Sequence, residues 1–281
     1  MSNYMAITCR EKIINMKKLF KVLAATIICG ATTFTSCTND DNPATPDLGV
    51  KEKIIGKWMT AENNGQPLTS NDKNVTTFIS ASKATVSVSR SDNEGAWNTE
   101  QEFDVTIKGN KVTLTGHPDE HQTVVYDYDV TAINGNEFSA SLKMTVTRDG
   151  NVVVSREGTV RYKKVTADYT AAILGLWECQ GITGGETNND DNARLEFLAD
   201  GTYNFYRRSD AGVWSLVPRQ RNEYFVDGNL LCTRWQAEGE QMSYEWWEIA
   251  SAADGQMEWT ALRQRTDGTT FQQAVTWTKV E

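Results

Sequence analysis

Two copies of one pattern, 115 to 119 residues apart, organise most of this chain. A Gly-x-Trp motif stands at Gly56–Trp58 and returns at Gly175–Trp177. Four more pairs follow in the same order: GAW at 95–97 with GVW at 212–214, KGN at 108–110 with DGN at 227–229, DG at 149–150 with DG at 267–268, and VRYKKV at 160–165 with VTWTKV at 275–280. Five anchors in one order at near-constant spacing indicate a tandem duplication. We therefore predict two domains, at 51–166 and 167–281, each about as long as a typical small domain.

Within both copies, apolar and polar residues alternate with a period of two. Examples are YDYDVT at 126–131, FSASLKMTV at 138–146 and RLEF at 194–197. This alternation is typical of half-buried antiparallel strands. Asp-Gly and Asn-Gly pairs separate the runs, as at 134–135 and 200–201, and such pairs favour hairpin turns. The sequence thus predicts an all-β protein of two tandem antiparallel barrels, with about seven or eight strands each.

One segment of the second copy carries a family resemblance. LEFLADGTY at 195–203 is followed by GVW at 212–214, whereas the first copy has TFISASKATV at 77–86, without the Asp-Gly. Together with the opening Gly-x-Trp, this pattern resembles the lipocalin-like domains of Gram-negative lipoproteins. The resemblance covers both copies, about 230 residues. It implies eight-stranded up-and-down barrels, which have room for side chains or one small ligand.

A basic and then apolar segment precedes the repeats. Three lysines at 17–21 are followed by a mostly apolar run at 22–31. This run is shorter than the roughly 20 residues that span a bilayer, and it has the proportions of a secretory signal peptide starting at Met16. FTSC at 34–37 resembles the bacterial lipobox. The resemblance implies that residues 1–36 are removed and that Cys37, carrying a diacylglycerol, begins the mature chain.

The residues after Cys37 predict where the protein is held. Asp40 and Asp41 resemble the acidic export tag of surface lipoproteins, and the Pro-containing stretch completes a flexible tether over 37–50. We expect an outer-membrane lipoprotein exposed on the cell surface, with the periplasmic face as the alternative. The chain carries −9 overall and residues 1–36 carry +4, so the remainder carries −13. An acidic body argues against nucleic acid as a partner and against adsorption to anionic lipid, which makes the lipid anchor the membrane contact.

Catalytic and metal-binding patterns are weak in this sequence. The only histidines, His117 and His121, lie in GHPDEH, where Pro118 favours a solvated turn over a metal site. The second copy contains no histidine, and no nucleophile and base can be paired. We therefore predict a non-enzyme with no catalytic residue, no metal and no cofactor.

Four residues are predicted to have structural roles. Trp58 and Trp177 are expected to plug the closed end of each barrel, because a large ring near a barrel end usually packs there. Cys179 and Cys232 lie in the second copy. In an oxidising compartment they can form a disulfide that joins the first strand to a middle one. The alternative is two small buried apolar side chains.

Aromatic residues are concentrated in the second copy, which holds seven of the nine tryptophans. Adjacent residues of a strand face opposite sides, so only one of Trp246 and Trp247 is expected to face the core. Aligning Tyr128 with Tyr244 places Trp247 on the polar face. Trp247 is thus predicted to be exposed, or covered by the other domain, a partner protein or a stacked sugar. The candidates for a ligand cavity are Tyr203, Phe205 and Trp235.

These observations favour one function and leave two alternatives. The favoured function is non-catalytic binding of a small, partly apolar ligand, chiefly by the second copy. One alternative is a surface module that binds glycan or protein through exposed aromatic residues such as Trp247. The other is a structural accessory lipoprotein whose barrels are filled by their own side chains. The sequence does not predict an oligomeric state.

Overall fold

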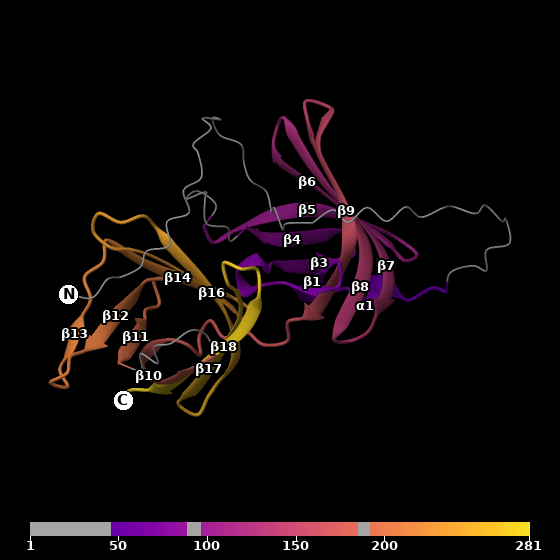
Figure 1. Cartoon of the computed structure of the whole chain (residues 1–281). Coiled ribbons are helices and arrows are strands. Elements are labelled where there is room, and N and C mark those ends of the chain that lie inside the picture. The colour runs from indigo at the N-terminus through magenta and orange to yellow at the C-terminus, as the bar shows by residue number, and fades with distance from the viewer. Residues whose placement is uncertain (1–45, 89–96, 185–191) are drawn as a thin grey trace, which may run out of the picture.

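The computed structural model of the chain describes residues 46–88, 97–184 and 192–281 (Figure 1). The predicted signal peptide, Cys37 and the first part of the tether lie outside these residues. In the part of the chain that the structure describes, no helix is long and apolar enough to cross a membrane.

The first half of the chain forms a closed barrel. Its antiparallel neighbours follow the order of the sequence, and β1 also pairs with β9, which closes a ring of eight strands. The two-residue strand β2 pairs with the end of β1 beside this ring. The strands are β1 (Gly56–Asn63), β2 (Gln66–Pro67), β3 (Val75–Ser80), β4 (Lys83–Val88), β5 (Thr99–Lys108), β6 (Lys111–Asp119), β7 (Gln122–Ile133), β8 (Glu137–Arg148) and β9 (Asn151–Lys164). Two short helices accompany them, α1 (Val50–Lys53) and the 3₁₀ helix η1 (Ser70–Asp72).

The second half forms a curled sheet of nine strands in the order β13-β12-β11-β10-β18-β17-β16-β15-β14. Its edge strands are β13 and β14, and Thr202, in the turn before β12, forms an isolated bridge with Glu223 of β14. The strands are β10 (Gly175–Thr183), β11 (Ala193–Phe197), β12 (Tyr203–Arg208), β13 (Trp214–Leu216), β14 (Arg221–Asp227), β15 (Leu230–Gln236), β16 (Ser243–Ala253), β17 (Gln256–Gln264) and β18 (Thr270–Lys279). The predicted all-β pair of barrel-like units is confirmed, with the first closed and the second open on one side.

The repeat is visible in the backbone of both sheets. In the first sheet, β1 has a bulge between Thr60 and Glu62, where it pairs with β9. In the second sheet, β10 has a bulge between Cys179 and Gly181, where it pairs with β18. These positions are 119 residues apart, the same shift as between the two Gly-x-Trp motifs. Bulges bend a strand and turn a sheet sharply, so both copies curl at the same point.

The Gly-x-Trp motif needs glycine for a conformational reason. Gly56 has φ 123° and Gly175 has φ 109°, backbone angles that residues other than glycine rarely adopt. A Cβ added there would also meet the lysine of the last strand, 3.1 Å from Lys164 Cε and 3.2 Å from Lys279 Cε. The glycine therefore lets this lysine lie over the tryptophan two residues later.

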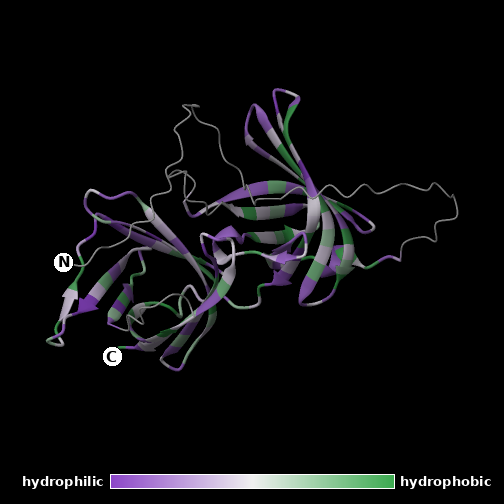
Figure 2. Cartoon of the chain, in the orientation of Figure 1, coloured by the Kyte–Doolittle hydropathy of each residue, from purple (hydrophilic) through white to green (hydrophobic). Residues whose placement is uncertain are grey.

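The first barrel is filled by its own side chains. Figure 2 shows the alternation of apolar and polar residues along its strands. Tyr128 and Tyr162 share a hydrogen bond of 3.1 Å in the interior, and burial raises the pKa of Tyr162 to about 12. A cavity beside Tyr126, Met144 and Tyr162 has a volume of about 60 Å³. This is room for about two waters, whereas ligand pockets span roughly 300–1,000 Å³.

The last part of the predicted tether packs against the first barrel. Val50 is buried and begins α1, and Leu48 packs on the barrel core. Asn110 holds this segment at two points, accepting from the Leu48 amide (3.0 Å) and donating to the Pro46 carbonyl (2.8 Å). The prediction of a flexible tether through residue 50 is therefore wrong for residues 46–50, because apolar side chains there find a surface to cover.

The two sheets dock on each other through an apolar cluster. Met59 and Val75 of the first sheet meet Phe225, Leu230 and Trp246 of the second. Trp97, which follows β4 in the chain, packs edge-on against the Phe225 ring at 4.8 Å. Burial of apolar surface from both sheets stabilises this contact.

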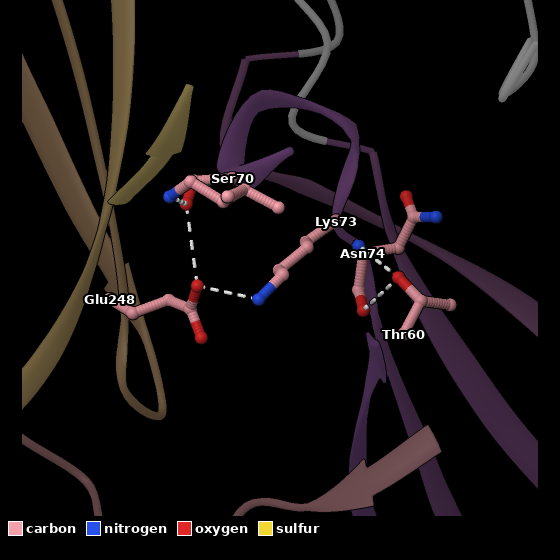
Figure 3. A network of polar contacts seen from close by, with 6 residues as sticks. Thr60, Ser70, Lys73, Asn74 and Glu248 are labelled. Atoms are coloured by element: carbon pink, nitrogen blue, oxygen red, sulfur yellow. Dashed lines mark hydrogen bonds and ion pairs between the residues drawn. The ribbon is translucent and has the colours of Figure 1, made fainter. Parts of the chain in front are cut away.

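Polar contacts surround this cluster. Lys73 Nζ lies 2.5 Å from the Glu248 carboxylate, which also accepts from Ser70 (Figure 3). On another side, the buried Asp227 accepts from Lys57 (2.5 Å) and from Ser87. Each of these bonds joins a residue of the first sheet to one of the second, so they fix the orientation in which the sheets dock.

Candidate functional site

Arg219 gathers the three residues predicted to line a ligand cavity. It lies in the connection between the edge strands β13 and β14. Its guanidinium carbon is 4.5 Å from the Phe205 ring centroid and 5.4 Å from that of Trp235. Its Nη1 group donates to the Tyr203 hydroxyl at 3.4 Å. The structure therefore brings Tyr203, Phe205 and Trp235 together around one cation.

Strand geometry explains the gathering. Tyr203 and Phe205 are two residues apart in β12, so they share a face, and Trp235 lies near the end of β15. Tyr203 is buried in the core of the second sheet, while Phe205 and Trp235 are half-buried at its margin. The cluster thus stands on the open side of the curled sheet, between the β12 and β15 walls.

The electrostatics of the cluster favour an anion. Among the residues that the structure describes, no carboxylate lies within ion-pair distance of Arg219, and its only hydrogen-bond acceptors are Tyr203 and Asn222, both at 3.4 Å. Burial lowers the pKa of Arg219, while the hydrogen-bonded Tyr203 acts in the opposite direction. Arginine stays charged at neutral pH even so. A half-buried cation with only neutral partners favours a negatively charged partner.

The Tyr203 hydroxyl is not prepared for catalysis. Burial raises its pKa above the ordinary value, although the nearby Arg219 acts in the opposite direction. A phenol with a raised pKa remains a neutral hydrogen-bonding group at neutral pH. The cluster can therefore bind and orient a ligand, and it supplies no evident general base.

Two buried donors lie in the same core. Trp259 and Trp277 are 3% and 5% exposed, their rings are 4.8 Å apart, and neither indole N–H has an acceptor in the described part of the chain. A buried donor without a partner costs about 1–3 kcal/mol. These two indoles are exceptions to the rule that buried polar groups are hydrogen-bonded.

The prediction of an exposed Trp247 is wrong. Trp247 is buried in the core of the second sheet against Trp259, and Trp246 faces the first sheet instead. Matching bulges, between Val130 and Ala132 in β7 and between Ile249 and Ser251 in β16, show a shift of 119. The alignment of Tyr128 with Tyr244 assumed a shift of 116 residues, three fewer than the observed shift. Because side chains alternate along a strand, an error of an odd number of residues assigns every side chain to the wrong face.

The predicted disulfide is also wrong. Cys179 lies in the core of the second sheet and Cys232 in the cluster between the two sheets, and both are thiols. Their side chains lie on opposite faces of the sheet, so no rotamer change can join them. The alternative of two small buried side chains holds.

We expect both thiols to react once the protein unfolds. Alkylation in denaturant without reductant should label Cys179 and Cys232 fully, and prior reduction should add no label at either position, read by mass spectrometry of peptides. Native protein should label slowly, because both residues are buried. Labelling of these two peptides only after reduction would contradict the structure.

Trp58 and Trp177 occupy equivalent buried positions. Trp58 is fully buried and Trp177 is 2% exposed. Each indole N–H donates to the carbonyl four residues earlier, Ile54 at 2.6 Å and Ile173 at 2.7 Å. Lysines lie over both rings, Lys164 at 5.1 Å and Lys279 at 5.3 Å. The two sites are copies of one structural device.

Both histidines of the first barrel contact polar side chains. His121 lies 2.9 Å from Asp149 and His117 lies 3.2 Å from Thr123. No group of three or more metal-ligating side chains is found in the described ranges. An open groove of about 550 Å³ crosses the outer face of β6 to β9, but its charges are of both signs.

The comparison with solved structures gives a distant likeness. No protein-family model matches the chain, and no curated protein matches it. Among solved structures, a double mutant of the vaccine antigen transferrin-binding protein B from Haemophilus parasuis Hp5 is similar, at 11% identity and a TM-score of 0.22. The match covers 84% of this chain and 64% of that chain, so it spans just under two thirds of that protein.

Proposed function

We propose that this chain is a lipid-anchored protein of the outer membrane whose second sheet binds a small, partly apolar ligand without catalysis. The gathering of Tyr203, Phe205 and Trp235 around Arg219, on the open side of the second sheet, carries this proposal. Half-buried aromatic rings with a few polar groups between them are typical of small-molecule sites. The lipobox-like segment at 34–37 supports the anchor.

The two sheets support different roles. The filled interior of the first barrel fits a structural role, because the 60 Å³ cavity beside Tyr126 is too small for a ligand. The first barrel also covers one face of the second through Met59 and Val75. The surface-binding alternative loses its main support, since Trp247 is buried. These observations support ligand binding on the open side of the second sheet.

Binding of a neutral apolar fluorophore tests this function. We expect N-phenyl-1-naphthylamine to gain fluorescence on the full mature chain, and Phe205→Ala or Trp235→Ala to weaken its affinity by about ten-fold each, as loss of a stacked ring implies. Trp214→Ala is the matched control, because Trp214 is a half-buried tryptophan of edge strand β13 that stacks on Arg194.

Two outcomes would contradict the proposal. Equal loss in Trp214→Ala would show that the probe reads surface stacking in general. Unchanged affinity in both site variants, with circular dichroism showing folded protein, would place the probe elsewhere. Organic extraction of natively purified protein, followed by mass spectrometry, should release a compound that the Phe205→Ala protein lacks.

A further inference from the structure

We infer that the ligand of the second sheet is a carboxylate with a planar or aliphatic apolar body, and that Arg219 binds its carboxylate side-on. This inference rests on the proposed function and adds the chemical class of the ligand. It depends on which edge of the guanidinium the protein uses and which edge it leaves open.

The guanidinium of Arg219 is only partly engaged. Both of its hydrogen bonds, to Tyr203 and Asn222, leave from the same nitrogen, Nη1. The other edge, formed by Nε and Nη2, has no acceptor among the residues that the structure describes. Two parallel N–H groups on one edge are the geometry that binds a carboxylate through both oxygens.

The protein orients this open edge. The rings of Phe205 and Trp235 lie near the guanidinium, and the Tyr203 hydroxyl holds Nη1 from the interior. Stacking on aromatic rings fixes the plane of an arginine while leaving its edge available. A carboxylate in that plane would place its apolar body against the same two rings, which are half-buried already.

The local charge selects a single negative charge. A second cation lies near, since the Arg207 guanidinium carbon is 5.2 Å from the Phe205 ring centroid. Of the nearby carboxylates, Glu245 forms an ion pair with Arg263 at 3.1 Å. Glu240 attracts Arg219 electrostatically without a hydrogen bond. One open arginine edge satisfies both oxygens of a carboxylate. A doubly charged phosphate would leave oxygens without donors in a half-buried place.

Matched charged and neutral probes test the inference on the full mature chain. We expect 2-naphthoate to bind at least ten-fold more tightly than its neutral amide, 2-naphthamide, since hydrogen bonds to charged groups are the stronger class. Arg219→Gln should remove this preference, so that 2-naphthoate and 2-naphthamide bind the variant with equal affinity. Kd is measured by calorimetry at fixed ionic strength.

Arg265→Gln is the control for general loss of positive charge. Arg265 also lies over an aromatic ring of the second sheet, with its guanidinium carbon 4.4 Å from the Phe271 centroid, and this variant should keep the preference for 2-naphthoate. Equal loss in both variants would reduce the effect to long-range attraction and overturn the inference. Circular dichroism and thermal unfolding check that each variant is folded.

The outcomes separate the inference from the proposed function. Equal affinity of the wild type for 2-naphthoate and 2-naphthamide would overturn the carboxylate preference and leave apolar binding standing. Binding of neither probe, together with no response to the neutral fluorophore, would overturn both. A preference that survives Arg219→Gln would assign the carboxylate to another cation and overturn the role of Arg219.

Discussion

Trp177→Ala is expected to lower the free energy of unfolding by about 3–5 kcal/mol, the range for truncating a buried large aromatic residue. The ring is 2% exposed and packs in the core of the second sheet. Its removal opens a cavity, leaves the Ile173 carbonyl without its 2.7 Å donor and takes the stacking surface from Lys279. The cost of the cavity and of the lost hydrogen bond adds to the free energy lost when the apolar ring is no longer buried.

Urea unfolding followed by circular dichroism measures this effect. Trp58→Ala should be similarly harmful, since Trp58 makes the equivalent bonds in the first barrel. Trp214→Ala is the control, because a half-buried ring on edge strand β13 contributes much less. If Trp177→Ala unfolded at the same urea concentration as Trp214→Ala, the buried Trp177 ring would not be needed for stability.

Cys37→Ala is expected to move the protein from the membrane fraction to the soluble fraction almost completely. The prediction depends on the lipobox resemblance at 34–37 and on the net charge of −13 in the remainder. Acyl chains contribute about 0.8 kcal/mol of membrane affinity per buried methylene. Without them an acidic surface has no attraction to anionic lipid.

Fractionation of cells and labelling with a radioactive fatty acid test the anchor. Cys29→Ala is the matched control, because Cys29 lies in the segment predicted to be removed, and this variant should stay labelled and membrane-bound. The released Cys37→Ala protein should keep the far-ultraviolet spectrum of the wild type, since both sheets begin after residue 50. Membrane retention of unlabelled Cys37→Ala protein would refute the anchor.

Register explains most of the difference between the predicted and the observed site. Alternation identified strands such as β7 and β8, and the repeated Gly-x-Trp identified both first strands, because these signals are local. Bulges are not visible in an alternation, so aligning Tyr128 with Tyr244 reversed the faces of Trp246 and Trp247. With the bulges aligned, Trp247 is equivalent to Tyr128, which faces the core of the first barrel.

Arg219 shows the second kind of limit. It lies in a polar connection, VPRQR at 217–221, and nothing in the sequence distinguishes it from an arginine that faces solvent. Only the return of β14 past β12 brings its guanidinium to Phe205 and Trp235. An aromatic candidate list could be drawn up from composition and alternation, whereas the cation at its centre depends on contacts between distant segments.

The sequence by itself determined the duplication and the all-β class, because the repeat spacing and the side-chain period can be read from the order of residues along the chain. The tertiary structure alone decided that the first barrel closes while the second stays open, that Trp246 joins the two sheets, and that the two thiols lie apart. Each of these depends on how distant strands meet, and a one-residue change of register alters the face that every side chain presents.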